Sequence, residues 1–266
     1  MGFEPVIWNE YTRDRKEVEG FIVEEELISI HVNGKEIASL MATPENQDWL
    51  AVGFLKNARL IDTVDEIEVL HVTREGCCVD IWLNHELKQP ERKIITSGCG
   101  GGILFEEPDL ETGRIDTEEV YSPEQLHGLF RKLQKEAALH SRAGGIHSSA
   151  LSDGRELLVT VEDIGRHNTV DKLCGFALLE GVDTHGKLLL TSGRVSSEMM
   201  LKAARMGCPL VASRNSPTSL SRKMAESWNI TLACYVRGRS MRVYTQPERI
   251  VNSLEDGQEN SFQQSG

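Results

Sequence analysis

The sequence predicts an α/β protein, and two observations support this prediction. From residue 147 onward, strand-like and helix-like runs alternate, as expected of a sheet covered by helices. Before residue 115, several strands surround one helix, which indicates a smaller α+β unit. We therefore expect an N-terminal extension at 1–19, a small α+β domain at 20–115, an α/β domain at 116–249 and a disordered tail at 250–266.

A β-hairpin is expected to open the small domain. Phe21–Val32 and Lys35–Ala42 read as strands, and the Asn33-Gly34 pair between them is favoured in type I′ turns. A helix should follow, with Thr43 as its N-cap. Its start is supported by Pro44 and its end is expected at Asn57. Three more strands are expected at Glu66–Val72, Cys77–Leu83 and Lys93–Ser97.

The larger domain is expected to begin with a capped helix. Ser122 and Gln125 have the spacing of a capping box, and Pro123 suits the first helical position. The apolar face of this helix would consist of Leu126, Leu129, Phe130 and Leu133, with the helix running toward His140. Strands are expected at Ser148–Ser152, Glu156–Asp163, Lys187–Gly193, Pro209–Asn215, Ile230–Val236 and Met241–Thr245, and helices at His167–Gly181, Ser196–Gly207 and Ser216–Trp228.

Composition limits the classes of function. The 266 residues are 39% hydrophobic and 26% charged, no apolar run approaches the roughly 20 residues of a membrane span, and the N-terminus does not resemble an export signal. We expect a cytoplasmic protein whose six cysteines are reduced thiols. No C-x-x-C pair occurs, so a zinc site of the usual paired spacing is not expected, although ligands distant in sequence remain an option.

The charge of the chain is unevenly distributed. A net charge of −12 argues against nucleic acid as a partner, because nucleic-acid binding requires positive surface. Between residues 191 and 245, however, nine Lys or Arg face only two Asp or Glu, a local balance of +7. This segment therefore favours binding of an anion, unless its arginines are simply solvated helix faces.

Cys99 is the main candidate for a reactive group. It follows a predicted strand and lies between Gly98 and the run Gly100–Gly102, which leaves the thiol unshielded. Backbone N–H groups of such a loop can face a thiolate or a transferred sulfur atom. The alternative is a flexible turn with an incidental thiol. Cys174 and Cys234 lie in apolar segments instead and are expected in the core.

A second candidate is the segment 161–168, where a strand ends at a glycine before a helix begins. His167 would act as a general acid or base, with Asp163 to orient it and Arg166 to hold an anion. Alternatively, Asp163 or Asn168 only caps the helix.

Two further strand-to-helix loops repeat this pattern and contain Arg194 and Arg214. Helix N-termini attract phosphate groups, and an arginine adds bidentate contacts. Ser196 and Ser216 are expected to be ordinary N-caps.

The last strand pair is joined by a cationic turn. This turn comprises Tyr235, Val236, Arg237, Gly238, Arg239 and Ser240, and Arg242 follows it. An aromatic ring beside several guanidinium groups suits a phosphate or a guanine ring. Together with the two arginine loops, it predicts a guanine-nucleotide-type ligand.

Long blocks of the sequence resemble the FdhD family of formate dehydrogenase accessory sulfurtransferases. The resemblance covers roughly residues 21–249. Its most specific parts are EDIGRHNTVDKL, TSGRVSSEMMLKAARMGCPLVASRNSPTSLSRKMAE and CYVRGRSMRVYT. It implies a cytidine-deaminase-like fold for the second domain.

The resemblance also implies a function. Members of the family take persulfide sulfur from a cysteine desulfurase and deliver it to the molybdenum bis(molybdopterin guanine dinucleotide) cofactor required by formate dehydrogenase. That cofactor would be a bound substrate, with no tightly held metal belonging to the protein itself. By position, Cys99 matches the persulfide cysteine and Tyr235–Ser240 the cofactor segment. Partners would be the desulfurase and apo-formate dehydrogenase, with no membrane and with a homodimer as an option.

One departure from the family pattern is important. Many members have C-G-x-C-G in the catalytic loop, whereas here Gly102 replaces the second cysteine. Cys99 must then act alone or with a distant thiol such as Cys77 or Cys208. Three other functions are alternatives: a cofactor-binding maturation chaperone without sulfur transfer, a nucleotide-binding regulator unrelated to molybdenum, and a zinc deaminase. The H-x-E and P-C-x-x-C patterns of zinc deaminases are absent from the sequence.

Overall fold

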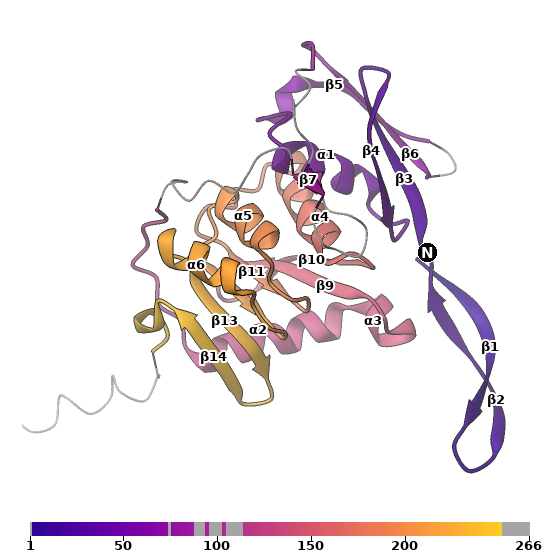
Figure 1. Ribbon diagram of the computed structural model, residues 1–266, viewed down its shortest axis with the longest axis vertical. Coiled ribbons are helices and arrows are strands. Elements are labelled where there is room, and N and C mark those ends of the chain that lie inside the picture. The colour runs from indigo at the N-terminus through magenta and orange to yellow at the C-terminus, as the bar shows by residue number, and fades with distance from the viewer. Residues whose placement is uncertain (1, 74–75, 88–93, 96–102, 105–113, 252–266) are drawn as a thin grey trace, which may run out of the picture.

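Two separate β-sheets and the helices packed on them make up most of the structure (Figure 1). The computed structural model describes residues 2–73, 76–87, 94–95, 103–104 and 114–251. The predicted α/β class is confirmed. The predicted domain limits stay a prediction, and the predicted tail lies outside the described residues beyond Val251. None of the described helices is long and apolar enough to cross a bilayer.

The larger sheet has six strands in the order β10-β9-β11-β12-β13-β14. Strand β11 is parallel to β12 and β12 to β13, whereas the other three neighbouring pairs are antiparallel. All six predicted strands of this region are confirmed, with small differences at their ends. They are β9 (His147–Ser152), β10 (Leu157–Asp163), β11 (Leu188–Thr191), β12 (Leu210–Ser213), β13 (Thr231–Arg237) and β14 (Ser240–Thr245).

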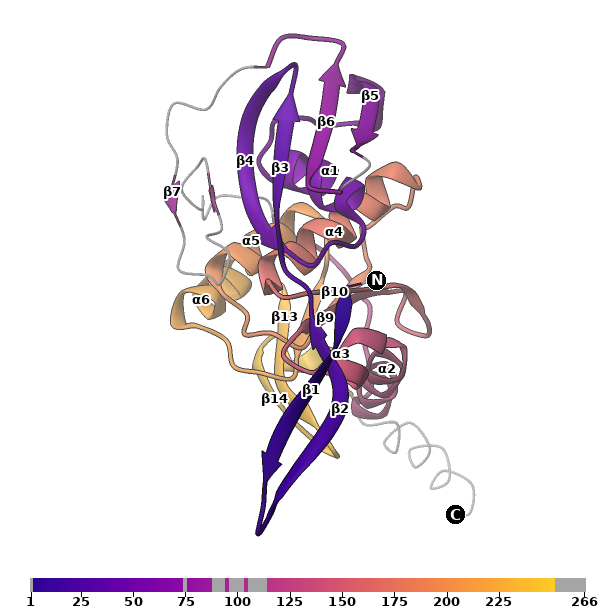
Figure 2. The same ribbon diagram turned by 90° about the vertical axis from the view of Figure 1, so that its right-hand side faces the viewer.

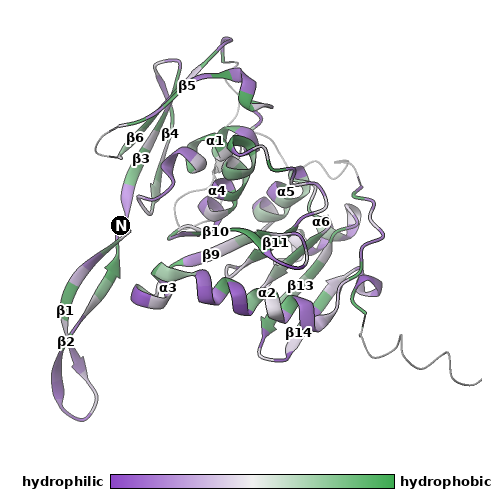
Figure 3. Cartoon of the chain, turned by 180° about the vertical axis from the view of Figure 1, so that it is seen from behind, coloured by the Kyte–Doolittle hydropathy of each residue, from purple (hydrophilic) through white to green (hydrophobic). Residues whose placement is uncertain are grey.

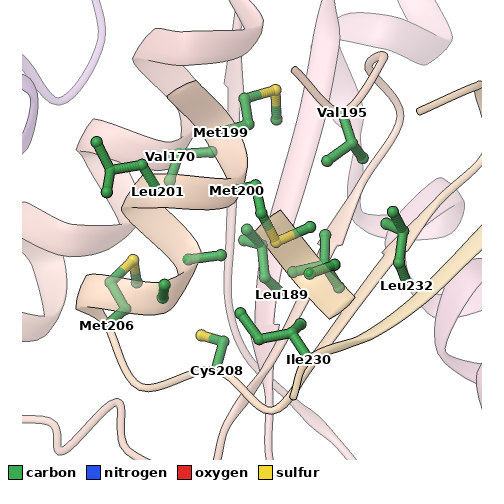
Figure 4. Close-up of a cluster of buried hydrophobic side chains, with 14 of the residues drawn as sticks. Val170, Leu189, Val195, Met199, Met200, Leu201, Met206, Cys208, Ile230 and Leu232 are labelled. Atoms are coloured by element: carbon green, nitrogen blue, oxygen red, sulfur yellow. The ribbon is translucent and has the colours of Figure 1, made fainter. Parts of the chain in front are cut away.

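Helices cover both faces of this sheet. One face packs against α4 (Arg166–Leu179), α5 (Ser197–Arg205) and α6 (Ser219–Ser227), and the other against α2 (Pro123–Glu136). Strand β11 is buried on both sides, because Leu189 joins the first cluster while Leu188 and Leu190 join the second. Figure 4 shows Leu189 among the side chains of α4 and α5. In Figure 3, β11 is coloured as hydrophobic and much of α2 as hydrophilic.

Local capping signals explain the start of α2. Ser122 is the N-cap, its side chain accepts a hydrogen bond from Gln125 N, and Gln125 completes the predicted capping box. The four predicted core residues of this helix are buried. The helical run is interrupted at Ala137, and α3 (Ala138–Ala143) follows.

The smaller sheet has the order β4-β3-β6-β5. Its strands are β3 (Glu26–Val32), β4 (Lys35–Ala42), β5 (Ile67–Val72) and β6 (Cys78–Leu83), and α1 (Gln47–Asn57) covers one face of it. Asn33 and Gly34 both have positive φ, as the predicted hairpin turn requires. The predicted cap was wrong: α1 begins later, with Asn46 as N-cap, because the Thr43 side chain and backbone are bonded to residues near the end of β10.

The first residues form a projecting hairpin of β1 (Phe3–Tyr11) and β2 (Arg15–Val23) (Figure 2). The predicted strand Phe21–Val32 is therefore wrong as a single element, since the chain passes from β2 to β3 at Glu24 and Glu25. The base of the hairpin lies against α3, where the Arg142 guanidinium is 5.1 Å from the ring centroid of Phe3. Short strands β7 (Ile94–Ile95) and β8 (Ile103–Leu104) pair with each other.

A close crossing of α1 and α4 joins the two sheets and their helices. A Cβ atom on Gly53 would lie 1.8 Å from Asp171 O, and one on Gly175 would lie 1.9 Å from Trp49 O. Real Cβ atoms do not approach oxygen this closely, so both backbones need glycine at the crossing. The crossing is flanked by Trp49 and Phe176, whose rings meet edge to face at 4.9 Å.

Replacing either glycine should destabilise the protein strongly. We expect Gly53→Ala or Gly175→Ala to lower the free energy of unfolding by about 3 kcal/mol or more, because a backbone carbonyl cannot move aside without separating the helices. Urea denaturation followed by circular dichroism measures this. Gly128→Ala is the control, since only a flexible arginine terminus approaches that site in α2, and it should be neutral or stabilising by about 0.5–1 kcal/mol. Equal stability of Gly53→Ala and Gly128→Ala would contradict this account.

Candidate functional site

Most of the predicted binding residues gather at one edge of the six-stranded sheet. Strands β10, β11, β12 and β13 all point their carboxyl ends to this edge, the usual place for ligands in α/β sheets. The loops there are tied together: Arg214 N donates to Thr191 O at 3.1 Å, and Tyr235 N donates to Asn215 O at 3.2 Å. Predicted site residues located at this edge or in the adjoining turn are His167, Arg194, Arg214 and Tyr235–Ser240.

The cationic turn has an unusual backbone. Tyr235 lies in a β-bulge of β13 with φ +54, a left-handed conformation that is uncommon for a bulky residue. Its ring lies close to two guanidinium groups, with the ring centroid 4.3 Å from Arg242 Cζ and 5.9 Å from Arg237 Cζ. Such strain is common at ligand sites.

The remaining residues of the turn differ in accessibility. The exposed ones are Arg237, Gly238, Arg239 and Ser240. Val236 is instead buried in the cluster beneath α2, so only its main chain can reach a ligand. The Arg237 Nε atom donates to Arg214 O at 2.7 Å, which connects the turn to the loop after β12.

The two strand-to-helix arginines occupy different surroundings. Arg194 is exposed in the loop after β11. Arg214 is half-buried and lines a small cavity with Ser192 and His140. Ser196 is the N-cap of α5, as predicted, but the expected cap at Ser216 is wrong because Thr218 caps α6.

His167 is buried beside α5 rather than open to a ligand. Its Nε2 atom lies 3.0 Å from Ser196 Oγ and 3.6 Å from Glu198 Oε2, and 4% of the residue is exposed. Burial lowers the pKa of His167 to about 4, and the Glu198 carboxylate only partly opposes this. The ring is therefore neutral near pH 7, where it accepts or donates a hydrogen bond but carries no charge.

Asp163 does not orient His167, which corrects that expectation. Its carboxylate accepts hydrogen bonds from Gly165 N and Asn168 Nδ2, both at 2.8 Å, and pairs with Lys172 Nζ at 2.7 Å. Asp163 and Lys172 are both fully buried. A paired, hydrogen-bonded charge of this kind is a structural element, because removing one partner leaves an uncompensated charge in the interior.

This buried pair also binds the smaller sheet to the larger one. Asp163 accepts from Thr43 N at 3.2 Å, and Lys172 Nζ donates to Thr43 O at 3.3 Å. Asn168 Nδ2 donates to Met41 O at 2.9 Å. The segment 163–172 therefore holds the two sheets together, a role that the sequence did not reveal.

A second buried network lies at the other end of the α1–α4 crossing. Lys202 Nζ pairs with Asp171 at 2.8 Å and with Glu198 at 3.1 Å. Asn57 donates to the same Asp171 carboxylate at 2.8 Å. Burial lowers the pKa of Lys202, but the two carboxylates more than offset this and raise it above its ordinary value. The sequence feature that could have revealed these buried networks is the presence of two adjacent charged residues, Asp171 and Lys172, in a helix whose other residues are mainly buried.

The structure describes five of the six cysteines. Cys99 lies outside the described residues, so its place stays a prediction. Cys174 and Cys234 are buried, as predicted, and so is Cys208. Burial raises the pKa of all three thiols to about 12, which makes Cys208 unsuitable as a second sulfur-carrying thiol. Cys77 is exposed.

A larger cavity lies apart from the sheet edge. Its volume is about 520 Å³, and it is enclosed by the ends of α1, α4 and α5. Lys56, Arg59 and Arg205 line it together with apolar residues such as Val182 and Met206. None of the predicted site residues that the structure describes lines this cavity.

Comparisons with known proteins agree on one family. A model described as the FdhD/NarQ family matches residues 23–251. Proteins named "Sulfur carrier protein FdhD" are 36% identical in Bacillus subtilis, covering 92% of this chain and 95% of that protein, and 32% identical in Staphylococcus aureus MRSA252, covering 85% and 88%. A crystal structure described as a "putative formate dehydrogenase accessory protein" from Desulfotalea psychrophila superposes with a TM-score of 0.78 at 26% identity, covering 94% of this chain and all of the other.

His167 should make the folded state less stable in acid. Its pKa falls from 6.5 to about 4 on folding, so between these values the unfolded chain binds a proton that the folded chain does not. The free energy of unfolding should therefore fall by roughly 3 kcal/mol from this source as the pH drops through that window. Urea denaturation of His167→Gln should show a smaller loss between pH 6.5 and 4 than the wild type. His185→Gln, at an exposed histidine, is the control and should match the wild type; identical curves for all three proteins would contradict the assignment.

Proposed function

Because the chain belongs to the FdhD/NarQ family, we propose that it is a cytoplasmic sulfur carrier with Cys99 as its persulfide-bearing residue. Sulfur would come from a cysteine desulfurase and pass to the molybdenum bis(molybdopterin guanine dinucleotide) cofactor of formate dehydrogenase. The observation that carries the proposal is the extent of the match: relatives named as sulfur carriers align over most of both chains.

The loading step needs only one free thiolate. The Cys99 thiolate attacks the outer sulfur of the desulfurase persulfide, a new S–S bond forms at Cys99, and the desulfurase cysteine leaves as a thiolate. No oxidant is required, because the sulfane sulfur is exchanged between two thiolates. In the delivery step the acceptor would supply the electron pair for its new bond to the outer sulfur, the S–S bond at Cys99 would break, and Cys99 would leave as a thiolate.

The sheet edge supports binding of a phosphorylated, guanine-containing acceptor. The turn at Arg237–Ser240 is exposed, and Tyr235 offers an aromatic face beside Arg242. Arg194 and Arg214 lie in the loops of this edge and Arg237, Arg239 and Arg242 in or beside the adjoining turn, in a chain whose net charge is −12, and such a group of cations favours an anionic ligand. Arg194 and Arg214 would add phosphate contacts. His167 is uncharged near pH 7 and would hold the start of α5 in place through its contact with Ser196.

Cys99→Ser should abolish sulfur loading. After incubation with an active cysteine desulfurase and cysteine, intact-mass analysis of the wild-type protein should show the added mass of one sulfur atom, and non-reducing peptide mapping should place it on Cys99. Cys77→Ser tests the remaining alternative: it should keep the adduct if Cys99 acts alone and lower it if the exposed Cys77 takes part. An adduct that persists on Cys99→Ser would reject the assignment of this residue.

The exposed arginines of the turn should control nucleotide affinity. We expect Arg237→Gln and Arg239→Gln each to weaken binding of guanosine diphosphate about tenfold or more, the loss typical of one charge-assisted hydrogen bond. Isothermal titration calorimetry measures the change. Arg222→Gln removes an equal charge from the half-exposed Arg222 of α6, which pairs with Glu226, and should bind as the wild type does. A uniform effect of all three substitutions would indicate general electrostatics rather than a site.

A second candidate function is a cofactor-binding maturation chaperone that moves no sulfur. The single loop cysteine favours it, because relay between two cysteines within that loop is excluded. The two candidates differ in one result. The chaperone binds guanosine diphosphate with or without Cys99 and never acquires the sulfur adduct.

A further inference from the structure

Three side chains that commonly bind metals converge on the smaller sheet. His31 lies on β3, and Cys78 and Asp80 lie on the adjacent strand β6, 47 residues away in sequence. In the parallel pairing of these strands, His31 is opposite Asp80. Their neighbours Ile30 and Val79 point to the other face, into the core beneath α1. The three polar side chains therefore lie on the open face, where each is partly exposed.

The distances fit a metal ion between them. His31 Nδ1 is 2.9 Å from Cys78 Sγ and 3.7 Å from Asp80 Oδ1, and Cys78 Sγ is 3.8 Å from that oxygen. Around a tetrahedral zinc ion, bond lengths of about 2.0–2.3 Å place neighbouring ligand atoms roughly 3.4–3.6 Å apart. Two of the three separations are already close to this value. The third reaches it by a small rotation of the half-exposed histidine or cysteine.

Two more residues of types that bind metals lie next to this cluster on the neighbouring strands of the sheet. Glu36 on β4 is opposite His31, and His71 on β5 is opposite Asp80. Residues directly opposite each other in a sheet project from the same face. A row of Glu36, His31, Asp80 and His71 thus crosses all four strands. Among the described residues, the ligand atoms within 4.8 Å of one another are those of His31, Cys78 and Asp80, so an end residue would have to change its side-chain rotamer to become the fourth ligand, and a water molecule would otherwise take that position.

A catalytic Cys-His-Asp arrangement explains the geometry less well. Such a triad uses one imidazole nitrogen for the nucleophile and the other for the carboxylate. Here, a single atom, His31 Nδ1, faces both the thiol and the carboxylate. His31 Nδ1, Cys78 Sγ and Asp80 Oδ1 are close to one another, as the ligand atoms of one metal ion are.

We propose that His31, Cys78 and Asp80 form a Zn²⁺ site on the open face of the smaller sheet. One thiolate, one imidazole and one carboxylate are all ordinary zinc ligands, whereas Mg²⁺ and Ca²⁺ prefer oxygen alone. The ion joins β3 to β6, the central pair of the sheet, with one coordination position left for solvent or a neighbouring side chain. This site is independent of Cys99 and of sulfur transfer. It differs from the expectation that the family resemblance gives, namely no tightly held metal belonging to the protein itself.

The test is metal binding to the purified full-length chain after removal of metals by a chelator. Calorimetric titration of the wild-type protein with Zn²⁺ should show one ion bound per chain. Co²⁺, used as a coloured substitute, should give a thiolate-to-cobalt charge-transfer band that Cys78→Ser abolishes. His31→Gln and Asp80→Asn should each lower Zn²⁺ affinity at least about tenfold, a loss seen even when an outer hydrogen-bond partner of a zinc ligand is removed.

Cys77→Ser is the matched control. Cys77 is the adjacent residue, but its thiol is directed to Glu26, with the sulfur 3.6 Å from Oε2. It should keep the wild-type cobalt spectrum and Zn²⁺ affinity, and Cys99→Ser should do the same. Loss of the band in either of these variants, but not in Cys78→Ser, would overturn the proposal.

Absence of Zn²⁺ binding by the wild type would also overturn it. Circular dichroism establishes that each variant is folded. Should Cys78→Ser fail to fold, X-ray absorption of the wild-type zinc complex decides the question: a single sulfur at about 2.3 Å with nitrogen and oxygen ligands supports the site, and a shell without sulfur rejects it.

Discussion

The contact between α1 and α4 is the constraint on which the rest of the structure depends. Gly53 and Gly175 let the two helix backbones meet without side chains between them. Because α1 covers the smaller sheet and α4 covers the larger one, this single contact sets how the two sheets face each other. Close packing of this kind tolerates no added methyl group, so the relative position of the sheets is defined within a narrow range.

Buried charges on either side of the crossing reinforce it. Asp163 and Lys172 bind Thr43 at one end, while Lys202 and Asp171 hold Asn57 at the other. Each charge is satisfied by several hydrogen bonds, which offsets the cost of taking it out of water. A segment that reads as catalytic, EDIGRHN, is therefore committed mainly to joining the sheets.

The side chains that could bind ligands lie in the loops and on the exposed faces. At the carboxyl edge of the six-stranded sheet, arginine side chains lie beside Tyr235, whose φ is positive. On the open face of the smaller sheet, a histidine, a cysteine and an aspartate lie close together. The buried networks lie beneath these surfaces and join the elements that carry them. The proposed site for an anionic cofactor and the proposed cation site thus lie on separate parts of the structure.

The sequence by itself determined the parts that depend on local interactions. The Ser122 capping box, the Asn33-Gly34 turn and the alternation of strands and helices follow from neighbours a few residues apart, and the structure confirms them. The cationic segment was visible for the same reason, since Tyr235 and Arg237 are close along the chain. The family resemblance was likewise present in ordered blocks of sequence and is confirmed by the comparisons.

Only the tertiary structure decided which of these residues are buried and which partners they meet. Thr43 looked like a helix cap, yet it bonds Asp163 from 120 residues away. His31 and Cys78 form no sequence motif, because the pairing of β3 with β6 alone brings them together. Desolvation and long-range pairing act in space rather than along the chain, so no local pattern predicts a neutral His167 or a row of polar side chains across four strands.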